Sequence, residues 1–149
     1  MATITEDYVS LETAKLLREK GFNEKTLAYY ECDILCHGEW FEWNNSPMGQ
    51  ISAPTLQMTM KWLREIHLWN IHAEQKCFDS GNRLHSKPYL LWCPYIQDVK
   101  QPPEKWDFGM SNRKDIIPDD FYYKGYKMAF DTYEEACEEA IKYCLDNLI

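Results

Sequence analysis

The feature that most constrains the fold is a change of hydrophobic period within residues 51–73. Up to residue 67 the core-type residues recur at the spacing of one buried helix face: Leu56, Met60, Leu63 and His67. From residue 69 they alternate, as on one face of a strand: Trp69, Ile71 and Ala73. The segment therefore predicts a helix that runs almost directly into a strand. Ser52 as N-cap and Pro54 in the first turn are expected to begin the helix.

The methionines and tryptophans of this segment fall where each element needs a buried face, so we interpret them as core rather than as a cofactor-binding motif. His67 would lie at the C-terminus of the helix. A protonated imidazole there is stabilised by the helix dipole.

Two further helices have start and stop signals. Ser10 is expected to cap a helix over 11–20, which Lys20-Gly21 would end. A last helix is expected from about Thr132 to the end of the chain, with Asp131 as the first residue of a capping box. Its outer face carries acidic residues, which we interpret as a solvated surface: Glu134, Glu135, Glu138, Glu139 and Asp146.

The remaining aromatic and β-branched runs predict strands at 27–35, 39–45, 88–96 and 121–130. The first two would be joined by a turn at His37-Gly38. Pro94 cannot donate a ladder hydrogen bond, so we expect it on an edge strand or near a strand end, and Gly125 suggests a bulge. The chain is thus expected to be α+β, with about three helices packed on a small, mostly antiparallel sheet of three to five strands. Its centre would be 69–73, 88–96 and 121–130.

Composition narrows the class of protein. A chain of 149 residues with 45% hydrophobic and 15% aromatic residues predicts a single globular domain over 1–149. The formal charge of −8 makes nucleic-acid binding unfavourable. The sequence shows neither an apolar run of about 18 residues nor a signal-peptide pattern, so we expect a cytoplasmic protein without a membrane span.

The six cysteines are interpreted as reduced thiols rather than as a disulfide framework. Cys137 and Cys144 would share a buried face of the last helix. A zinc site would require Cys36-His37 to meet a second ligand pair such as His67 and His72 in space, because the sequence contains no CxxC or HxxxH motif. We expect neither a metal nor another cofactor.

The sequence contains no recognised catalytic motif: GxGxxG, GxxxxGK[ST], HExxH and GxSxG are all absent. The adjacent side chains of Cys36 and His37 would diverge in a strand, so they do not predict a nucleophile with its base. We therefore propose no catalytic residue, and an unrecognised small enzyme stays open as an alternative.

Residues 97–120 show no clean period, and a loop of that length is usually functional or contains a short element. Aromatic side chains in irregular, polar neighbourhoods are the candidate binding residues: Trp40, Trp43 and Trp106. Partial burial beneath loops is the alternative explanation for them.

Residues 12–31 resemble the opening of a MerR-type helix-turn-helix, through a short helix, a glycine turn and the run Thr26–Glu31. Ala28 stands where that family has arginine, and the turn is about two residues longer. The resemblance implies a DNA-binding regulator with a basic face formed by Lys15, Arg18, Lys20 and Lys25.

Three blocks in the same order, 8–22, 51–67 and 130–149, resemble a family of small uncharacterised proteins encoded by phages, prophages and mobile elements of gut Bacteroidetes. This resemblance implies a genomic context and no catalytic residues. We therefore expect a non-catalytic accessory protein that binds a host protein or a small ligand. A homodimer formed through remaining apolar surface is a further alternative.

Overall fold

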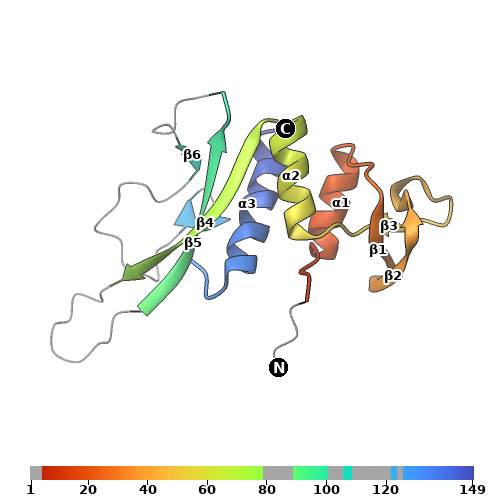
Figure 1. Ribbon diagram of the computed structural model, residues 1–149, viewed down its shortest axis with the longest axis horizontal. Helices are drawn as coiled ribbons and strands as arrows, with labels where there is room; N and C mark the ends of the chain where they lie inside the picture. The colour runs from red at the N-terminus through yellow and green to blue at the C-terminus, as the bar shows by residue number, and fades with distance from the viewer. Residues whose placement is uncertain (1–4, 79–88, 101–105, 109–121, 124–125) are drawn as a thin grey trace.

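The structure is a computed structural model that describes residues 5–78, 89–100, 106–108, 122–123 and 126–149. For residues 39–41, 78, 89, 106–108, 122–123 and 126 it describes the backbone and not the side chain. A layer of helices lies between two sheets (Figure 1). The helices are α1 (Leu11–Glu19), α2 (Leu56–Ile66) and α3 (Tyr133–Asn147).

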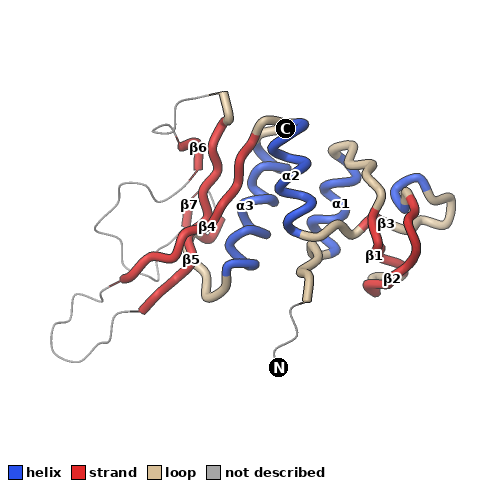
Figure 2. The backbone as a smooth tube through the Cα atoms, viewed as in Figure 1, coloured by secondary structure: helices blue, strands red, loops and turns tan. Residues whose placement is uncertain are grey.

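Both sheets are antiparallel. Their strands lie on opposite sides of the helices (Figure 2). The larger has the order β4-β5-β6, with β4 (Trp69–Phe78), β5 (Tyr89–Asp98) and β6 (Trp106–Phe108). The smaller has the order β2-β1-β3, with β1 (Thr26–Glu31), β2 (Ile34–Phe41) and β3 (Ile51–Ser52). A hairpin of β7 (Tyr122–Tyr123) and β8 (Tyr126–Lys127) and the 3-10 turn η1 (Trp43–Asn45) are also described. The predicted α+β class is confirmed, and the helices separate the strands into two sheets.

Helix α3 forms the centre of the core, because it contacts β4 and β5 as well as α1 and α2. Its buried face contains small side chains that allow this close packing: Ala136, Cys137, Ala140 and Cys144. The predicted burial of Cys137 and Cys144 is confirmed, and burial raises the pKa of the Cys137 thiol to about 11.

The predicted passage from helix to strand is confirmed. Helix α2 ends at Ile66, His67 is its C-cap, and β4 begins at Trp69. Leu68 makes the connection with a φ of +64°, the left-handed conformation in which the chain reverses. The predicted start was wrong: Ser52 belongs to β3, and Thr55 caps the helix by accepting a hydrogen bond from the Met58 N–H at 3.2 Å.

The turn between the first two strands also differs from the prediction. Cys32 and Asp33 form it, with φ values of +48° and +63°, and Glu31 pairs with Ile34 on either side. Two successive left-handed residues are the mark of a type I′ hairpin turn. Gly38 is instead needed within β2 for a close approach, because a Cβ there would lie 3.0 Å from the Tyr29 ring and 3.1 Å from the Trp43 ring.

Replacing Cys32 by Asn and Asp33 by Gly should therefore stabilise the protein by roughly 1 kcal/mol, because Asn-Gly adopts this turn with less strain. The free energy of unfolding in urea measures the change. Cys77→Asn is the matched control for loss of an exposed thiol and should be neutral. A double variant no more stable than this control would show that the turn stores no strain.

Strand β5 pairs with β4 from Trp69↔Asp98 to Phe78↔Tyr89, so the predicted antiparallel pair is confirmed. The prediction that Pro94 lies on an edge or near a strand end was wrong, because β5 is the middle strand and Pro94 lies within it. Trp92 exchanges backbone hydrogen bonds with Phe130, on the side away from β4. Backbone N–H groups two residues apart on a strand point the same way, so the nitrogen of Pro94, like that of Trp92, faces away from β4. The β4–β5 pairing therefore loses no hydrogen-bond donor at Pro94.

The predicted strand over 121–130 is two short strands, β7 and β8, that pair with each other, followed by a bridge from Phe130 to Trp92. Gly125, where we predicted a bulge, lies outside the described residues. Within the 97–120 segment, the described part contains the end of β5 and the short strand β6.

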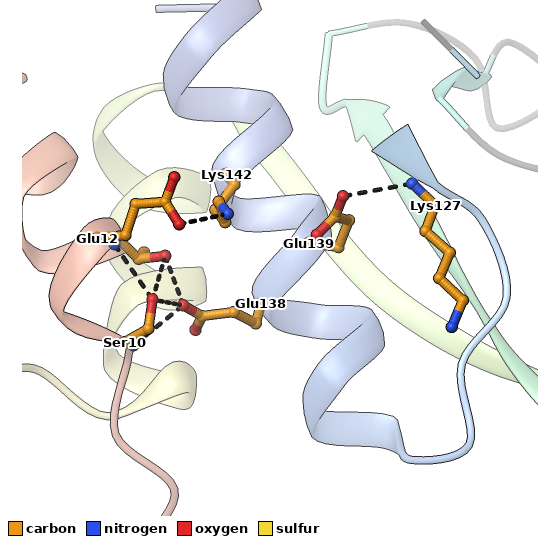
Figure 3. A network of polar contacts seen from close by, with 7 residues as sticks. Ser10, Glu12, Lys127, Glu138, Glu139 and Lys142 are labelled. Atoms are coloured by element: carbon orange, nitrogen blue, oxygen red, sulfur yellow. Dashed lines mark hydrogen bonds and ion pairs between the residues drawn. The ribbon is translucent and has the colours of Figure 1, made fainter. Parts of the chain in front are cut away.

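The acidic face of α3 is partly engaged rather than wholly solvated (Figure 3). A Glu138 oxygen accepts hydrogen bonds from the Ser10 N–H at 3.0 Å and from the Ser10 and Thr13 hydroxyls. The Lys142 ammonium lies 2.8 Å from a Glu12 carboxylate oxygen. The cap of the helix is Thr132 and not Asp131, because the Thr132 hydroxyl accepts from the Glu135 N–H at 3.2 Å. Glu138 thus ties α3 to the start of α1.

Glu138→Ala should lower the free energy of unfolding by about 1–3 kcal/mol, because the fully buried Thr13 loses its charged acceptor. Glu134→Ala, on the same helix and exposed, is the control and should change it by less than about 0.5 kcal/mol. Equal losses from the two variants in urea unfolding would contradict the assigned tie.

Candidate binding groove

Two neighbouring hollows lie at the end of the molecule formed by the small sheet. The first, of about 470 Å³, is lined by residues that include Leu27, Pro54 and Met58. The second, of about 620 Å³, is lined by residues that include Trp43 and Met48. Lys25 and Glu42 line both hollows, so we call the two adjoining hollows together the Lys25–Glu42 groove.

Side-chain amides fix the loop that carries η1 and walls the second hollow. Asn44 donates to the Phe22 carbonyl at 2.5 Å and accepts from the Ser52 N–H at 3.0 Å. Gln50 donates to a Glu31 oxygen at 3.0 Å and accepts from the Ser46 hydroxyl at 2.7 Å. Because these bonds join the loop to the α1–β1 connection, to β1 and to β3, the wall is formed before any ligand binds.

Strand β2 has extra residues beside Leu27, which lines the first hollow. Thr26 pairs with Phe41 and Ala28 with His37, so residues 38–40 of β2 lie opposite the single residue Leu27 of β1. A bulge of this kind bends a strand and redirects side chains. Leu27 lines the first hollow with half of its side chain exposed.

Exposed apolar groups line both hollows. Leu27 is 50% exposed and Met48 is 76% exposed, and these are two of six large hydrophobic side chains that are exposed in the described part of the chain. Four charged residues also line the joined groove: Glu6, Glu24, Lys25 and Glu42. With three carboxylates and one ammonium, the groove has an acidic excess.

Of the three predicted binding residues, Trp43 lies at this groove. Its ring is half-buried and stacks on Tyr29, with ring centroids 4.0 Å apart and an angle of 29° between the planes. Trp40 belongs to β2 and Trp106 to β6, and their side chains lie outside the described residues. Sequence reasoning placed Lys25 in a DNA-binding face rather than in this groove and did not identify Leu27, Met48 or Glu42 as binding residues. The imperfect alternation of residues 27–45 was the available signal of the irregularity in β2.

A second polar cluster lies on the β4–β5 sheet. His72 Nε2 lies 3.3 Å from a Glu74 oxygen, the His72 ring stacks on Tyr95, and the Lys76 ammonium lies 5.1 Å from the centre of the Tyr95 ring. Cys93 pairs with Glu74 across the strands, and burial raises the pKa of its thiol to about 11. This cysteine is therefore a thiol at neutral pH and not an activated nucleophile.

The four residues considered for zinc do not gather. Cys36 and His37 lie in β2, His72 lies in β4 on the other side of the helix layer, and His67 caps α2 (Figure 1). Among the residues whose positions are described, no three His, Cys, Asp or Glu side chains are grouped as metal ligands.

The helix-turn-helix interpretation was wrong, because Thr26–Glu31 forms strand β1 and not a second helix. Lys20, part of the expected basic face, donates to the Ile149 carbonyl at 2.6 Å and so fixes the end of α1 to the end of α3. Lys25 lines the groove instead.

No protein-family model, curated protein or solved structure matches the chain. Within the described ranges, the helices are too short or too polar to cross a bilayer.

His67 departs from the expected role at its helix C-terminus. Burial lowers its pKa, its ring packs edge-on against Trp62 at 4.4 Å between centroids, and its buried Nε2 has no hydrogen-bond partner among the described residues. Burial therefore favours the neutral imidazole at this helix end, whereas the expected role required the protonated form.

Lowering the pH through the ordinary histidine pKa of about 6.5 should therefore destabilise the protein, because the unfolded chain binds a proton that folded His67 resists. His67→Phe keeps a ring against Trp62 and cannot titrate, so its free energy of unfolding should fall less between about pH 7.5 and about pH 5. Identical pH profiles of wild type and variant, measured in urea, would contradict this assignment.

Proposed function

We propose that the protein is a non-catalytic binding protein that holds a segment of a partner protein in the Lys25–Glu42 groove. The observation that carries the proposal is a pre-formed groove with one strongly exposed apolar side chain in each hollow, Leu27 and Met48. Exposed apolar residues grouped in a concave surface gain free energy when a partner removes them from water.

The chemistry of the groove favours a protein over nucleic acid. Its lining has more carboxylates than ammonium groups, and the chain as a whole has a formal charge of −8, so a phosphate backbone would be repelled. Met48, Met58 and Trp43 are among the lining residues, and methionine and aromatic side chains are enriched at protein interfaces.

The setting we propose is the cytoplasm of a bacterial host, where the protein would act as an accessory factor of a phage or mobile element. The resemblance of three sequence blocks to such proteins supports this setting. The six cysteines, all of which lie in the described part of the chain, are not joined by disulfides, as is usual for proteins of a reducing compartment.

A photo-crosslinking amino acid at Leu27 or Met48 should form one defined adduct in a lysate of a gut Bacteroidetes host. The same group at Ile66, an apolar residue of α2 whose exposure of 62% lies between those of Leu27 and Met48, is the control and should not form it. The captured protein, once purified, should bind the double variant Leu27→Ser/Met48→Ser at least about tenfold more weakly than wild type, which removing two apolar contacts predicts.

Ile66→Ser should leave that affinity unchanged. The proposal fails if no adduct forms from the groove positions, if Ile66 gives the same adduct, or if the double variant binds as well as wild type. An adduct with a second copy of this chain would assign the groove to self-association instead.

A further inference from the structure

The charges that line the Lys25–Glu42 groove are incompletely compensated. Glu6 and Glu24 are exposed and have no ion-pair partner in the parts of the chain that are described. Glu42 accepts a hydrogen bond from the Asn45 amide at 3.2 Å, which leaves its negative charge unneutralised. Lys25 makes no ion pair with any of the three in the described residues. The first hollow therefore presents an acidic rim.

The apolar groups lie beside this rim rather than apart from it. Leu27, Pro54 and Met58 line the same hollow as Glu6 and Glu24, and Met48 and Pro47 line the second hollow with Glu42. Methionine side chains adapt to apolar partners of different shape. A peptide segment whose apolar side chains fill both hollows would therefore also lie next to the carboxylates of Glu6, Glu24 and Glu42.

We infer that the groove takes a short peptide segment of a partner protein in which lysine or arginine stands between apolar residues. The apolar side chains would occupy the hollows at Leu27 and Met48, and the basic side chain would lie against Glu6, Glu24 and Glu42. This inference rests on the proposed function and adds the chemical class of the occupant. Acidic peptides are repelled by the same carboxylates.

A library of random 12-residue peptides displayed on phage tests the inference against three immobilised proteins. These are the wild type, the charge-reversed variant Glu6→Lys/Glu24→Lys, and the matched control Glu19→Lys/Glu65→Lys. The control changes the net charge equally, and its two positions are exposed and lie outside the groove lining. Circular dichroism checks that all three proteins are folded.

Wild type and control should both enrich peptides that carry Lys or Arg beside Leu, Ile, Phe or Met, and the charge-reversed variant should not. A synthetic peptide of the enriched sequence should bind the charge-reversed variant about tenfold more weakly in about 50 mM NaCl, because exposed charges are weakly screened there. At about 500 mM NaCl the difference should shrink to less than about threefold, since the Debye length falls to about 4 Å and exposed charges are then largely screened.

The outcomes separate this inference from the proposed function. Peptides that lose binding with Leu27→Ser but have no basic excess, or bind the charge-reversed variant equally well, would overturn the cationic occupant and leave groove binding intact. Peptides that bind independently of Leu27, or no enrichment at all, would overturn a peptide occupant. The crosslinking from Leu27 and Met48 then decides separately whether the groove binds a protein.

Discussion

The packing of α3 is the constraint on which the rest of the structure depends. This helix contacts β4 and β5 as well as α1 and α2, so most of its circumference other than the acidic face must exclude water. Small side chains at Ala136, Ala140, Cys137 and Cys144 allow neighbours to approach it closely. Larger side chains at these four positions would push the larger sheet and the helices α1 and α2 apart. The small sheet would move with α1, which supports it.

Polar contacts then set the position of α1 on this centre. Glu138 receives three hydrogen bonds from Ser10 and Thr13, at the end where α1 begins (Figure 3). The Lys20 ammonium binds the Ile149 carbonyl at the other end. Helix α1 is thus held at both termini against α3. The small sheet follows, because β3 contacts α1 and the Tyr30 hydroxyl donates to the Val9 carbonyl at 2.8 Å. The groove is in this way connected to the core through α1.

The groove itself results from irregular features placed on a firm support. Gly38 permits the close approach of the Tyr29 and Trp43 rings, and the extra residues of β2 lie opposite Leu27. Asn44 and Gln50 tie the following loop to the strands beside it. Binding sites are commonly built in this manner, with exposed side chains on loops that a rigid sheet positions. Trp43, chosen from the sequence as a binding candidate, contributes a wall of the groove and also covers β1.

What the sequence by itself determined is local. The period change at residue 67 identified the passage from α2 to β4, Ser10 identified the start of α1, and the alternation over 88–96 identified β5. Each depends on residues within a few positions of one another, through capping hydrogen bonds and the geometry of a single face. Only the tertiary structure decided that Gly38 lies inside a strand while Cys32 and Asp33 turn, and that the strands form two sheets. The same holds for the placing of Leu27 and Met48 in two hollows that share Lys25 and Glu42, because strand register and close approach depend on partners distant in sequence.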